Sequence, residues 1–452
     1  MKGSLMHKRL RTIVGAAVTT IAVTAALTGC SNSGGGSSND GGNAGQVDAA
    51  LKAGGTLTYW SWTPSAAAQV KAFEKAYPKV TVKLVNAGTG TDEYTKLQNS
   101  VKAGSGAPDV AQVEYFALPQ FALADSLTDL TQYGFNDLKS KYTSGTWGSV
   151  SLDGKLYGLP QDSGPMAMFY NKTLFEKYSI QVPKTWDEYI AAAKKLHKAD
   201  PKAYINSDTG DAGFTTSMIW QAGGRPFEVD GSKVSINLQD AGTKKWADTW
   251  NELVENKLLA QTPGFTDDWY KQLAGGEIAT QITGAWFPGV IESGAKAGSG
   301  DWAVAPIPTY DGKTAVTAEN GGGAQVVMKQ SKNQALAAGF VKWLNSSDDS
   351  VNTFLASGGF PSTTATLDSS EFLATKPDYF GGQAINEVLK SSSDSVASGW
   401  KYLPFQVYAN SIYADTVGQS YADFSDINTG LKAWQTALVK YGNEQGFTVT
   451  AK

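Results

Sequence analysis

Nucleophilic and metal chemistry have few candidate residues in this sequence. The 452-residue chain contains one cysteine, Cys30, and two histidines, His7 and His197. Structural zinc sites, Cys-His dyads and Ser-His-Asp triads all need more thiols or imidazoles than these. Carboxylates are the remaining reactive type. A glycosidase needs two of them, about 5 Å apart or about 6.5–9.5 Å apart, and Glu114 and Asp162 are one candidate pair.

The single cysteine closes an N-terminal segment with the features of a secretory leader. Four basic residues and no acidic residue precede Cys30, and an apolar run occupies residues 13–27. That run is shorter than the roughly 20 residues that span a bilayer, and it ends at small residues, as a cleavable signal peptide does. Cys30 closes the sequence L-T-G-C, which resembles the bacterial lipobox. We therefore expect removal of the signal peptide, residues 1–29, and lipidation of Cys30, whose two or three acyl chains would anchor the chain to a membrane.

The mature chain is acidic. Residues 1–29 carry four positive charges and no negative one, so their removal changes the formal net charge from −4 to −8. An acidic body does not indicate nucleic acid or anionic lipid as a partner. The removal also leaves His197 as the only histidine, within a K-K-L-H-K run that is typical of a solvated helix face. We therefore expect no metal site.

Length and composition predict a tether followed by two lobes. Residues 30–46 are rich in Ser, Gly and Asn, cannot bury enough apolar surface to fold, and are expected to form a flexible lipidated tether. The folded body is then expected to begin near Gly55. About 400 mature residues exceed one typical core, which predicts two lobes. We place the first lobe at 47–115 plus about 306–362, and the second at about 116–305 plus 363–452.

The start of the body alternates strand and helix patterns. Strand patterns at 56–62, 80–85 and 109–113 enclose helix patterns at 66–77 and 92–102. This order predicts a mostly parallel sheet with helices on both faces. Ligands of such sheets bind at the carboxyl ends of the strands, so topology alone makes candidates of Trp60, Trp62, Glu114 and Tyr115. Core packing is the alternative for the two tryptophans, and their alternation places one of them inward.

Further local signals follow along the chain. The sequence S-L-D-G-K-L-Y-G-L-P predicts a hairpin with Asp153 and Gly154 in its turn. Thr185 and Glu188 have the spacing of a capping box. Helices are predicted at 118–130, 212–224, 246–259, 267–274, 333–344, 384–390, 405–419 and 427–441, strands at 278–286 and before Met328, and a tight crossing between lobes at 358–363.

Several motifs, in this order, resemble one protein family. They are Y-G-L-P-x-D followed by Y-N-K-x-L-F, the helix start P-K-T-W-D-E-Y, I-A-T-Q-I-T-G-A-W at 278–286, P-I-P near Pro306, and the block at 321–344. Together they resemble the extracellular solute-binding proteins (family 1, lipoprotein type) of bacterial ABC sugar importers, over nearly the whole mature chain. The resemblance implies a periplasmic-binding-protein-like α/β fold with two lobes. Each lobe would have a mostly parallel sheet flanked by helices, and crossing hinge strands would let the lobes close on a carbohydrate.

The resemblance also implies which residues contact a sugar. Trp286 occupies the G-x-W position that these proteins place in the cleft, where its ring would stack on a pyranose. Glu114 and Asp162 hold positions where carboxylates accept hydrogen bonds from sugar hydroxyls. Further candidates are Trp62, Tyr115, Trp220, Phe287 and the glycine run Gly321, Gly322 and Gly323, with Glu319 and Asn320 beside it. Three consecutive glycines depart from the commonest family pattern, which leaves the register of that contact open.

The resemblance implies a non-enzymatic, monomeric receptor without a cofactor, held by lipid at the outer face of the cytoplasmic membrane. It would deliver an oligosaccharide to an ABC permease. Two alternatives remain. A binder of a peptide or polyamine would have a cleft richer in carboxylates than in tryptophans. A secreted glycosidase is disfavoured, because no signature of those enzymes is recognisable and the two-lobe order is typical of a binder.

Overall fold

The structure of this chain is a computed structural model that describes residues 44–452. The predicted signal peptide, the lipidation site Cys30 and the tether up to residue 43 lie outside this range.

The folded body begins earlier than the sequence indicated. Helix α1 (Ala44–Ala53) packs on α12 (Gln334–Ser346) and buries Val47 and Leu51. The expectation of a start near Gly55 is therefore wrong. The last residues of the predicted tether belong to a helix, because its two apolar side chains, four positions apart, are covered by a distant segment.

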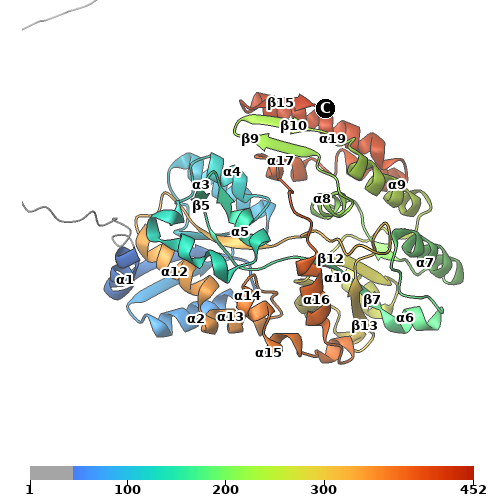
Figure 1. The fold of residues 1–452 in the computed structure, drawn as a ribbon, viewed down its shortest axis with the longest axis horizontal. Helices are drawn as coiled ribbons and strands as arrows, with labels where there is room; N and C mark the ends of the chain where they lie inside the picture. Colours follow the sequence, from blue (N-terminus) through green and yellow to red (C-terminus); the bar gives the residue numbers. More distant parts are fainter. Residues whose placement is uncertain (1–43) are drawn as a thin grey trace, which may run out of the picture. The chain divides into compact units, whose positions relative to one another are not determined.

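The first lobe is built on a five-stranded sheet of order β2-β1-β3-β14-β6 (Figure 1). Strands β1, β2 and β3 run parallel, as predicted, while β14 is antiparallel to both of its neighbours. The bounds are β1 (Gly55–Trp60), β2 (Val80–Val85), β3 (Val110–Glu114), β14 (Gly323–Val327) and β6 (Leu159–Pro160). Packing helices include α2 (Ala66–Ala76), α3 (Thr91–Ala103), α12 and α13 (Asp348–Leu355).

The first lobe extends further along the chain than expected. We placed the start of the second lobe at about residue 116, but residues 118–159 pack into the core of the first sheet, with Leu118, Phe121 and Trp147 buried there. The segment contains α4 (Leu118–Leu123), α5 (Ser144–Val150) and the predicted hairpin, whose strands are β4 (Ser151–Leu152) and β5 (Lys155–Leu156). The chain leaves this lobe only after β6, which pairs with β14 at the edge of the sheet.

The second lobe has several small sheets instead of one mostly parallel sheet. In one of them the central strand β7 is antiparallel to both β12 and β13. In another, β8 and β11 pair in parallel. The bounds are β7 (Met166–Asn171), β8 (Asn206–Ser207), β11 (Leu259–Ala260), β12 (Thr280–Gly284), β13 (Trp302–Pro306), and a separate sheet of β9 (Phe227–Asp230), β10 (Lys233–Ile236) and β15 (Thr448–Ala451).

Helices complete the second lobe around a tryptophan-rich core. Trp186, Trp246, Trp250 and Trp434 are fully buried there, and the predicted capping box of Thr185 and Glu188 is confirmed. The helices are α6 (Lys172–Lys177), α7 (Trp186–Ala199), α8 (Ala212–Gln221), α9 (Ala241–Glu255), α10 (Asp267–Gly275), α11 (Phe287–Gly294), α14 (Thr364–Leu367), α15 (Ser370–Leu373), α16 (Ile385–Asp394), α17 (Gln406–Ser411), α18 (Val417–Asp423) and α19 (Ile427–Glu444).

Two predicted helices are interrupted within their apolar patterns. The pattern at 118–130 ends as α4 at Leu123, because Asp125 adopts a left-handed conformation (φ 51°). The pattern at 405–419 divides into α17 and α18. Apolar periodicity alone does not reveal either interruption.

Three segments cross between the lobes and pair with one another. The Met166 N–H donates to the Ala318 carbonyl (2.9 Å) and the Asn320 N–H to the Gly164 carbonyl (2.7 Å), joining the segments at 160–166 and 317–323. The Ser163 N–H donates to Phe360 (3.2 Å), which joins the predicted crossing at 358–363 to the first segment. The crossing segments therefore form one narrow ribbon.

Candidate functional site

The ribbon of crossing segments has two faces. Consecutive side chains of extended backbone point in opposite directions, so Asn320 and Glu319 diverge, while Tyr115 lies in the turn that follows Glu114. Tyr115 and Glu319 line a groove that Glu114 and Asn320 do not line. We call the side of Glu114 and Asn320 the front face, and the side of Tyr115 and Glu319 the rear face.

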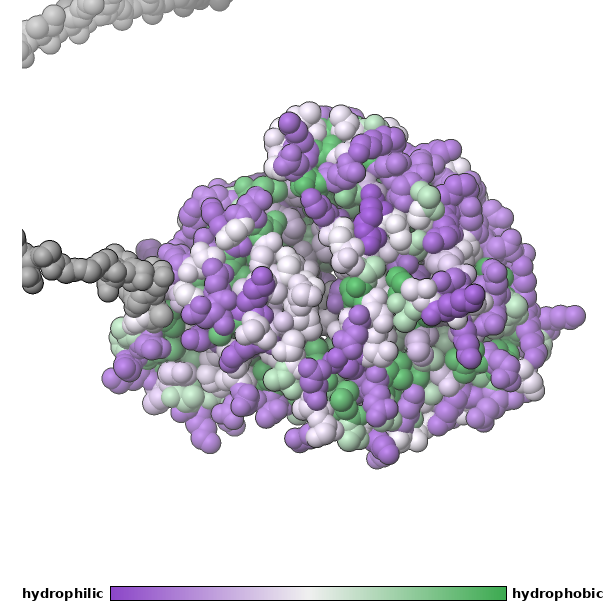
Figure 2. All heavy atoms as spheres, viewed as in Figure 1, coloured by the Kyte–Doolittle hydropathy of each residue, from purple (hydrophilic) through white to green (hydrophobic). Residues whose placement is uncertain are grey.

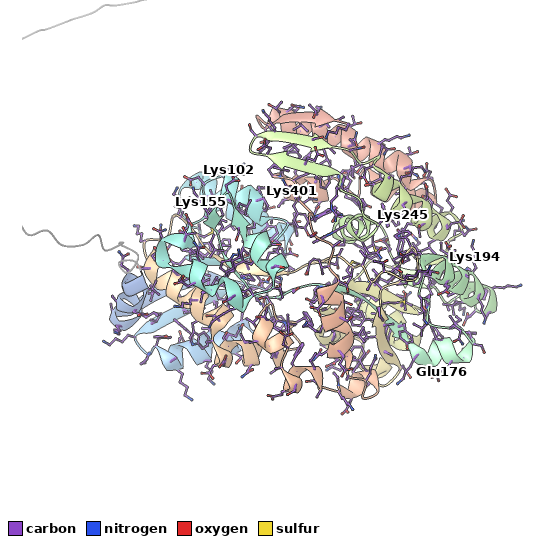
Figure 3. The ribbon with its side chains drawn as sticks, in the orientation of Figure 1. Lys102, Lys155, Glu176, Lys194, Lys245 and Lys401 are labelled. Carbon is purple, nitrogen blue, oxygen red and sulfur yellow. The ribbon has the colours of Figure 1, made fainter. Side chains whose placement is uncertain are left out.

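A groove of about 860 Å³ lies on the rear face and is lined from both lobes. Figure 2 shows the surface hollowed between α5 and β9, which both contribute to this groove. Lys401, labelled in Figure 3, also lines it and donates to the Val229 carbonyl (3.0 Å). Of the predicted ligand residues, the groove contains Tyr115, Trp220 and Glu319.

The rear residues largely bond to one another. Trp220 is 8% exposed, lies parallel to Trp400 (centroids 5.3 Å apart, planes at 8°) and donates its indole N–H to the Ala397 carbonyl (2.6 Å). Glu319 is 9% exposed and accepts hydrogen bonds from the Ser163 hydroxyl (2.9 Å) and the Gly164 N–H (2.5 Å). Burial raises the pKa of Glu319 to about 7. Trp220 and Glu319 are therefore engaged within the protein, although the partly buried Trp400 and Tyr402 also line this groove.

On the front face, the first lobe contributes a carboxylate and an aromatic pair. Glu114 is the last residue of β3 and accepts a hydrogen bond from the Tyr94 hydroxyl (2.9 Å). The Tyr94 ring also meets Trp62 edge-on (centroids 6.2 Å apart), which places Trp62, at the end of β1, beside the carboxylate. Burial raises the pKa of Glu114 to about 7, with Asp162 and Asp211 adding to the shift. Trp62 and Glu114 are both only partly buried.

The second lobe contributes Trp286 to the front face. Its indole N–H donates to the Asn320 carbonyl (2.7 Å), which fixes the ring against the crossing segment. Trp286 is partly buried, and the ring of Phe265 lies beside it (centroids 6.2 Å apart, planes at 26°). Asn320 also accepts a hydrogen bond from Thr283 (3.0 Å) through its amide oxygen.

The glycine run connects the two halves of the front face. Gly321 (φ 82°) and Gly322 (φ 90°) are in the left-handed region. A Cβ atom at Gly321 would lie 2.9 Å from the Trp286 indole nitrogen, and one at Gly322 would lie 2.7 Å from the Tyr115 ring. Gly323 pairs with Glu114 in the sheet. Only glycine fits the first two positions, and the run spans the roughly 10 Å of backbone between Trp286 and Glu114.

Two further carboxylates lie near the front face. Asp162 accepts a hydrogen bond from the Gly323 N–H (2.7 Å), which holds the glycine run in place, and burial raises its pKa to about 6. Asp211 caps α8 by accepting from the Phe214 N–H (2.6 Å), yet its side chain is exposed. Since Asp211 raises the pKa of Glu114, it lies within electrostatic reach of the front face.

One predicted contact is wrong. Phe287 is fully buried and packs against Phe169 (centroids 5.0 Å apart) and Trp269 (6.0 Å). It follows Trp286 directly, and the start of α11 turns its side chain into the core instead of outward. The aromatic side chain of Phe287 therefore indicated core packing and not contact with a ligand.

Sequence reasoning missed Asp211 and Phe265. Asp211 has the residue type and the position of a helix N-cap. That role explains the residue, so the sequence gives no reason to look for a second one. Phe265 lies in the sequence T-P-G-F-T, where an aromatic residue among turn formers is a signal of exposure that the analysis did not use. In residues 44–452 we find no group of three side chains able to hold a metal ion and no helix able to cross a membrane.

Comparison with known proteins agrees with this architecture. Residues 59–350 match the family model described as bacterial extracellular solute-binding protein. The arabinooligosaccharide-binding protein of Bacillus subtilis (strain 168) is 28% identical over 359 residues, which cover 75% of this chain and 81% of that protein. The lactose-binding protein of Rhizobium radiobacter is 25% identical, over 73% of this chain and 80% of that protein.

Solved structures of high similarity were determined with bound disaccharides. The ABC transporter associated binding protein of B. animalis subsp. lactis Bl-04, in complex with β-1,6-galactobiose, has a TM-score of 0.82 and 43% identity, over 87% of this chain and 99% of that one. The galacto-N-biose/lacto-N-biose I-binding protein of Bifidobacterium longum, in complex with lacto-N-biose, has a TM-score of 0.78 and 29% identity, over 88% and 99%.

Proposed function

Because the chain belongs to the family of bacterial extracellular solute-binding proteins, we propose that it is the receptor of a bacterial ABC importer and captures an oligosaccharide. The family consists of binding proteins, so the chain is not a glycosidase. We propose the front face of the crossing segments as the sugar site.

One observation carries this assignment: the front face offers partly exposed tryptophans from both lobes together with an incompletely occupied carboxylate. Trp62 and Trp286 are both partly buried; Tyr94 links Trp62 to Glu114, and the glycine run links Glu114 to Trp286. A pyranose needs an aromatic ring against its C–H face and charged acceptors for its hydroxyls. In the rear groove, Trp220 stacks on Trp400 and Glu319 already accepts two hydrogen bonds.

The first candidate ligand is β-1,6-galactobiose. The support is the relative solved with this disaccharide, which shares 43% identity with the present chain over 87% of its length. Lactose, lacto-N-biose and arabino-oligosaccharides follow, as sugars named for other relatives.

The anchor and the partners belong to the same proposal. Acylated Cys30 would hold a monomeric receptor at the outer face of the cytoplasmic membrane, and the residues after it would let the lobes reach a permease. Cys30→Ser is expected to release the protein into the medium and to leave its sugar affinity unchanged. Retention of the variant on cells would contradict the anchor.

Calorimetry of the purified protein tests the function. The titrants are β-1,6-galactobiose, lactose, lacto-N-biose, arabinotriose and, as non-sugars, spermidine and a tripeptide. We expect 1:1 binding of at least one oligosaccharide and no heat with the non-sugars. Binding of spermidine or the peptide without any sugar would overturn the proposal.

A further inference from the structure

Phe265 is an exposed aromatic side chain in a loop of the second lobe. Among the exposed large hydrophobic side chains of residues 44–452 it has the highest exposure, 63%, ahead of Leu123 at 47%. It lies in the loop between β11 and α10, far from either chain terminus. Exposure of one phenylalanine is ordinary by itself, so its backbone and its neighbours decide its significance.

The backbone holds Phe265 in a conformation that a non-glycine residue avoids. Its φ is +64°, in the left-handed region. The loop is fixed on both sides, since Ser207 donates to the Thr262 carbonyl and Thr266 donates to the Pro263 carbonyl (2.8 Å). Thr266 also caps α10 by accepting from the Trp269 N–H (3.3 Å). Strain of this kind, kept by surrounding hydrogen bonds, is typical of functional positions.

The ring of Phe265 continues the aromatic surface of Trp286. Their planes lie within 26° of parallel, and their centroids are 6.2 Å apart. Near-parallel rings at this separation are displaced sideways, as offset aromatic pairs are. The buried Trp269 packs against the ring of Phe265 (centroids 5.3 Å apart). The two rings therefore form one offset aromatic pair, in which Phe265 is the more exposed ring.

We infer that Phe265 forms a second aromatic platform beside Trp286. It would bind a further sugar unit, so the site would favour ligands longer than those that contact only Trp286 and Glu114. The inference rests on the proposed function and names its substrate class, an oligosaccharide that extends past Trp286. A unit stacked on Phe265 would bury its C–H face there and keep its hydroxyls in water.

The test compares chain lengths in two variants. Calorimetry would measure the affinities of β-1,6-linked galactobiose, galactotriose and galactotetraose for the wild type, Phe265→Ala and Phe265→Tyr. We expect the wild type to bind the best longer chain about fivefold or more tighter than the disaccharide. Phe265→Ala should remove this preference and Phe265→Tyr should keep it. If galactobiose does not bind, the same variants are measured with the oligosaccharide series that calorimetry identifies.

Controls separate this inference from the proposed function. Leu123→Ala removes another exposed apolar side chain, one that lines the rear groove, and should leave the preference intact. A wild type that binds sugar but gains nothing with chain length, or a Phe265→Ala variant that keeps its preference, overturns the inference alone. A uniform loss of affinity and thermal stability in Phe265→Ala would assign the residue to packing and also overturn it. No binding of any sugar would instead defeat the proposed function.

Discussion

The two faces of the crossing segments contain the same residue types in different states. Each has a carboxylate whose pKa burial raises to about 7, Glu114 in front and Glu319 behind. Each also has a tryptophan with a bonded indole N–H, Trp286 in front and Trp220 behind. The rear tryptophan is covered by a parallel partner ring, whereas the front one is partly exposed. Residue type therefore does not distinguish a binding face from a packing face, but the remaining exposure and hydrogen-bonding capacity do.

The largest expected effect is a loss of stability caused by a substitution on the rear face. Trp220→Ala removes a side chain that is 8% exposed, so we expect the free energy of unfolding to fall by about 3–5 kcal/mol. Sugar affinity of the folded protein should stay within about twofold. Denaturant unfolding and calorimetry on the same sample measure both. A selective loss of affinity would move the sugar site to the rear groove.

The matched change on the front face should have the opposite signature. Trp286→Ala removes the stacking platform, worth about 0.5–1.5 kcal/mol beyond the area it buries. We expect affinity to weaken about tenfold or more, which corresponds to about 1.4 kcal/mol, with a smaller change in unfolding free energy than in Trp220→Ala. Unchanged affinity would remove Trp286 from the site.

The pH dependence of binding should come from the front carboxylate. Ionised Glu114 accepts charge-assisted hydrogen bonds from hydroxyls, and its raised pKa of about 7 places this ionisation between pH 6 and 8. Affinity should therefore rise about fivefold over that interval. Glu114→Gln should abolish the rise, whereas Glu319→Gln should retain it. A flat profile in the wild type would contradict this role.

The raised pKa of Glu114 also makes the stability of the folded protein depend on pH. The folded protein holds the Glu114 proton more tightly than the unfolded chain, because its pKa is raised from 4.5 to about 7. The contribution of this group to stability is therefore fully present below about pH 4.5 and is lost as pH rises through about 7. Thermal melting of Glu114→Gln should show a weaker decline over this range than the wild type.

The smallest expected effect concerns the rim of the rear groove. Lys401 donates to the Val229 carbonyl from an exposed position, so Lys401→Ala should change stability by less than about 0.5 kcal/mol. Sugar affinity should stay within about twofold by calorimetry. A larger loss of affinity would indicate that the ligand extends through to the rear groove.

Local signals in the sequence predicted much of the fold. The strand β2, the hairpin at Asp153 and the capping box at Thr185 depend on residues within a few positions of one another, and all three are present. The lobe boundary near 116 depended on which of two cores would accept residues 118–159. That choice is a property of distant segments, and the local pattern does not contain it.

The sequence alone predicted the secretory signal and determined the family resemblance and the glycine run, because each is a property of consecutive residues. Tertiary structure decided that Trp286 is partly exposed while Phe287 is buried, and that Trp220 stacks on Trp400. It also decided that Phe265 lies beside Trp286. These outcomes depend on the packing of segments far apart in the chain, and packing leaves some aromatic rings covered and others free for a ligand.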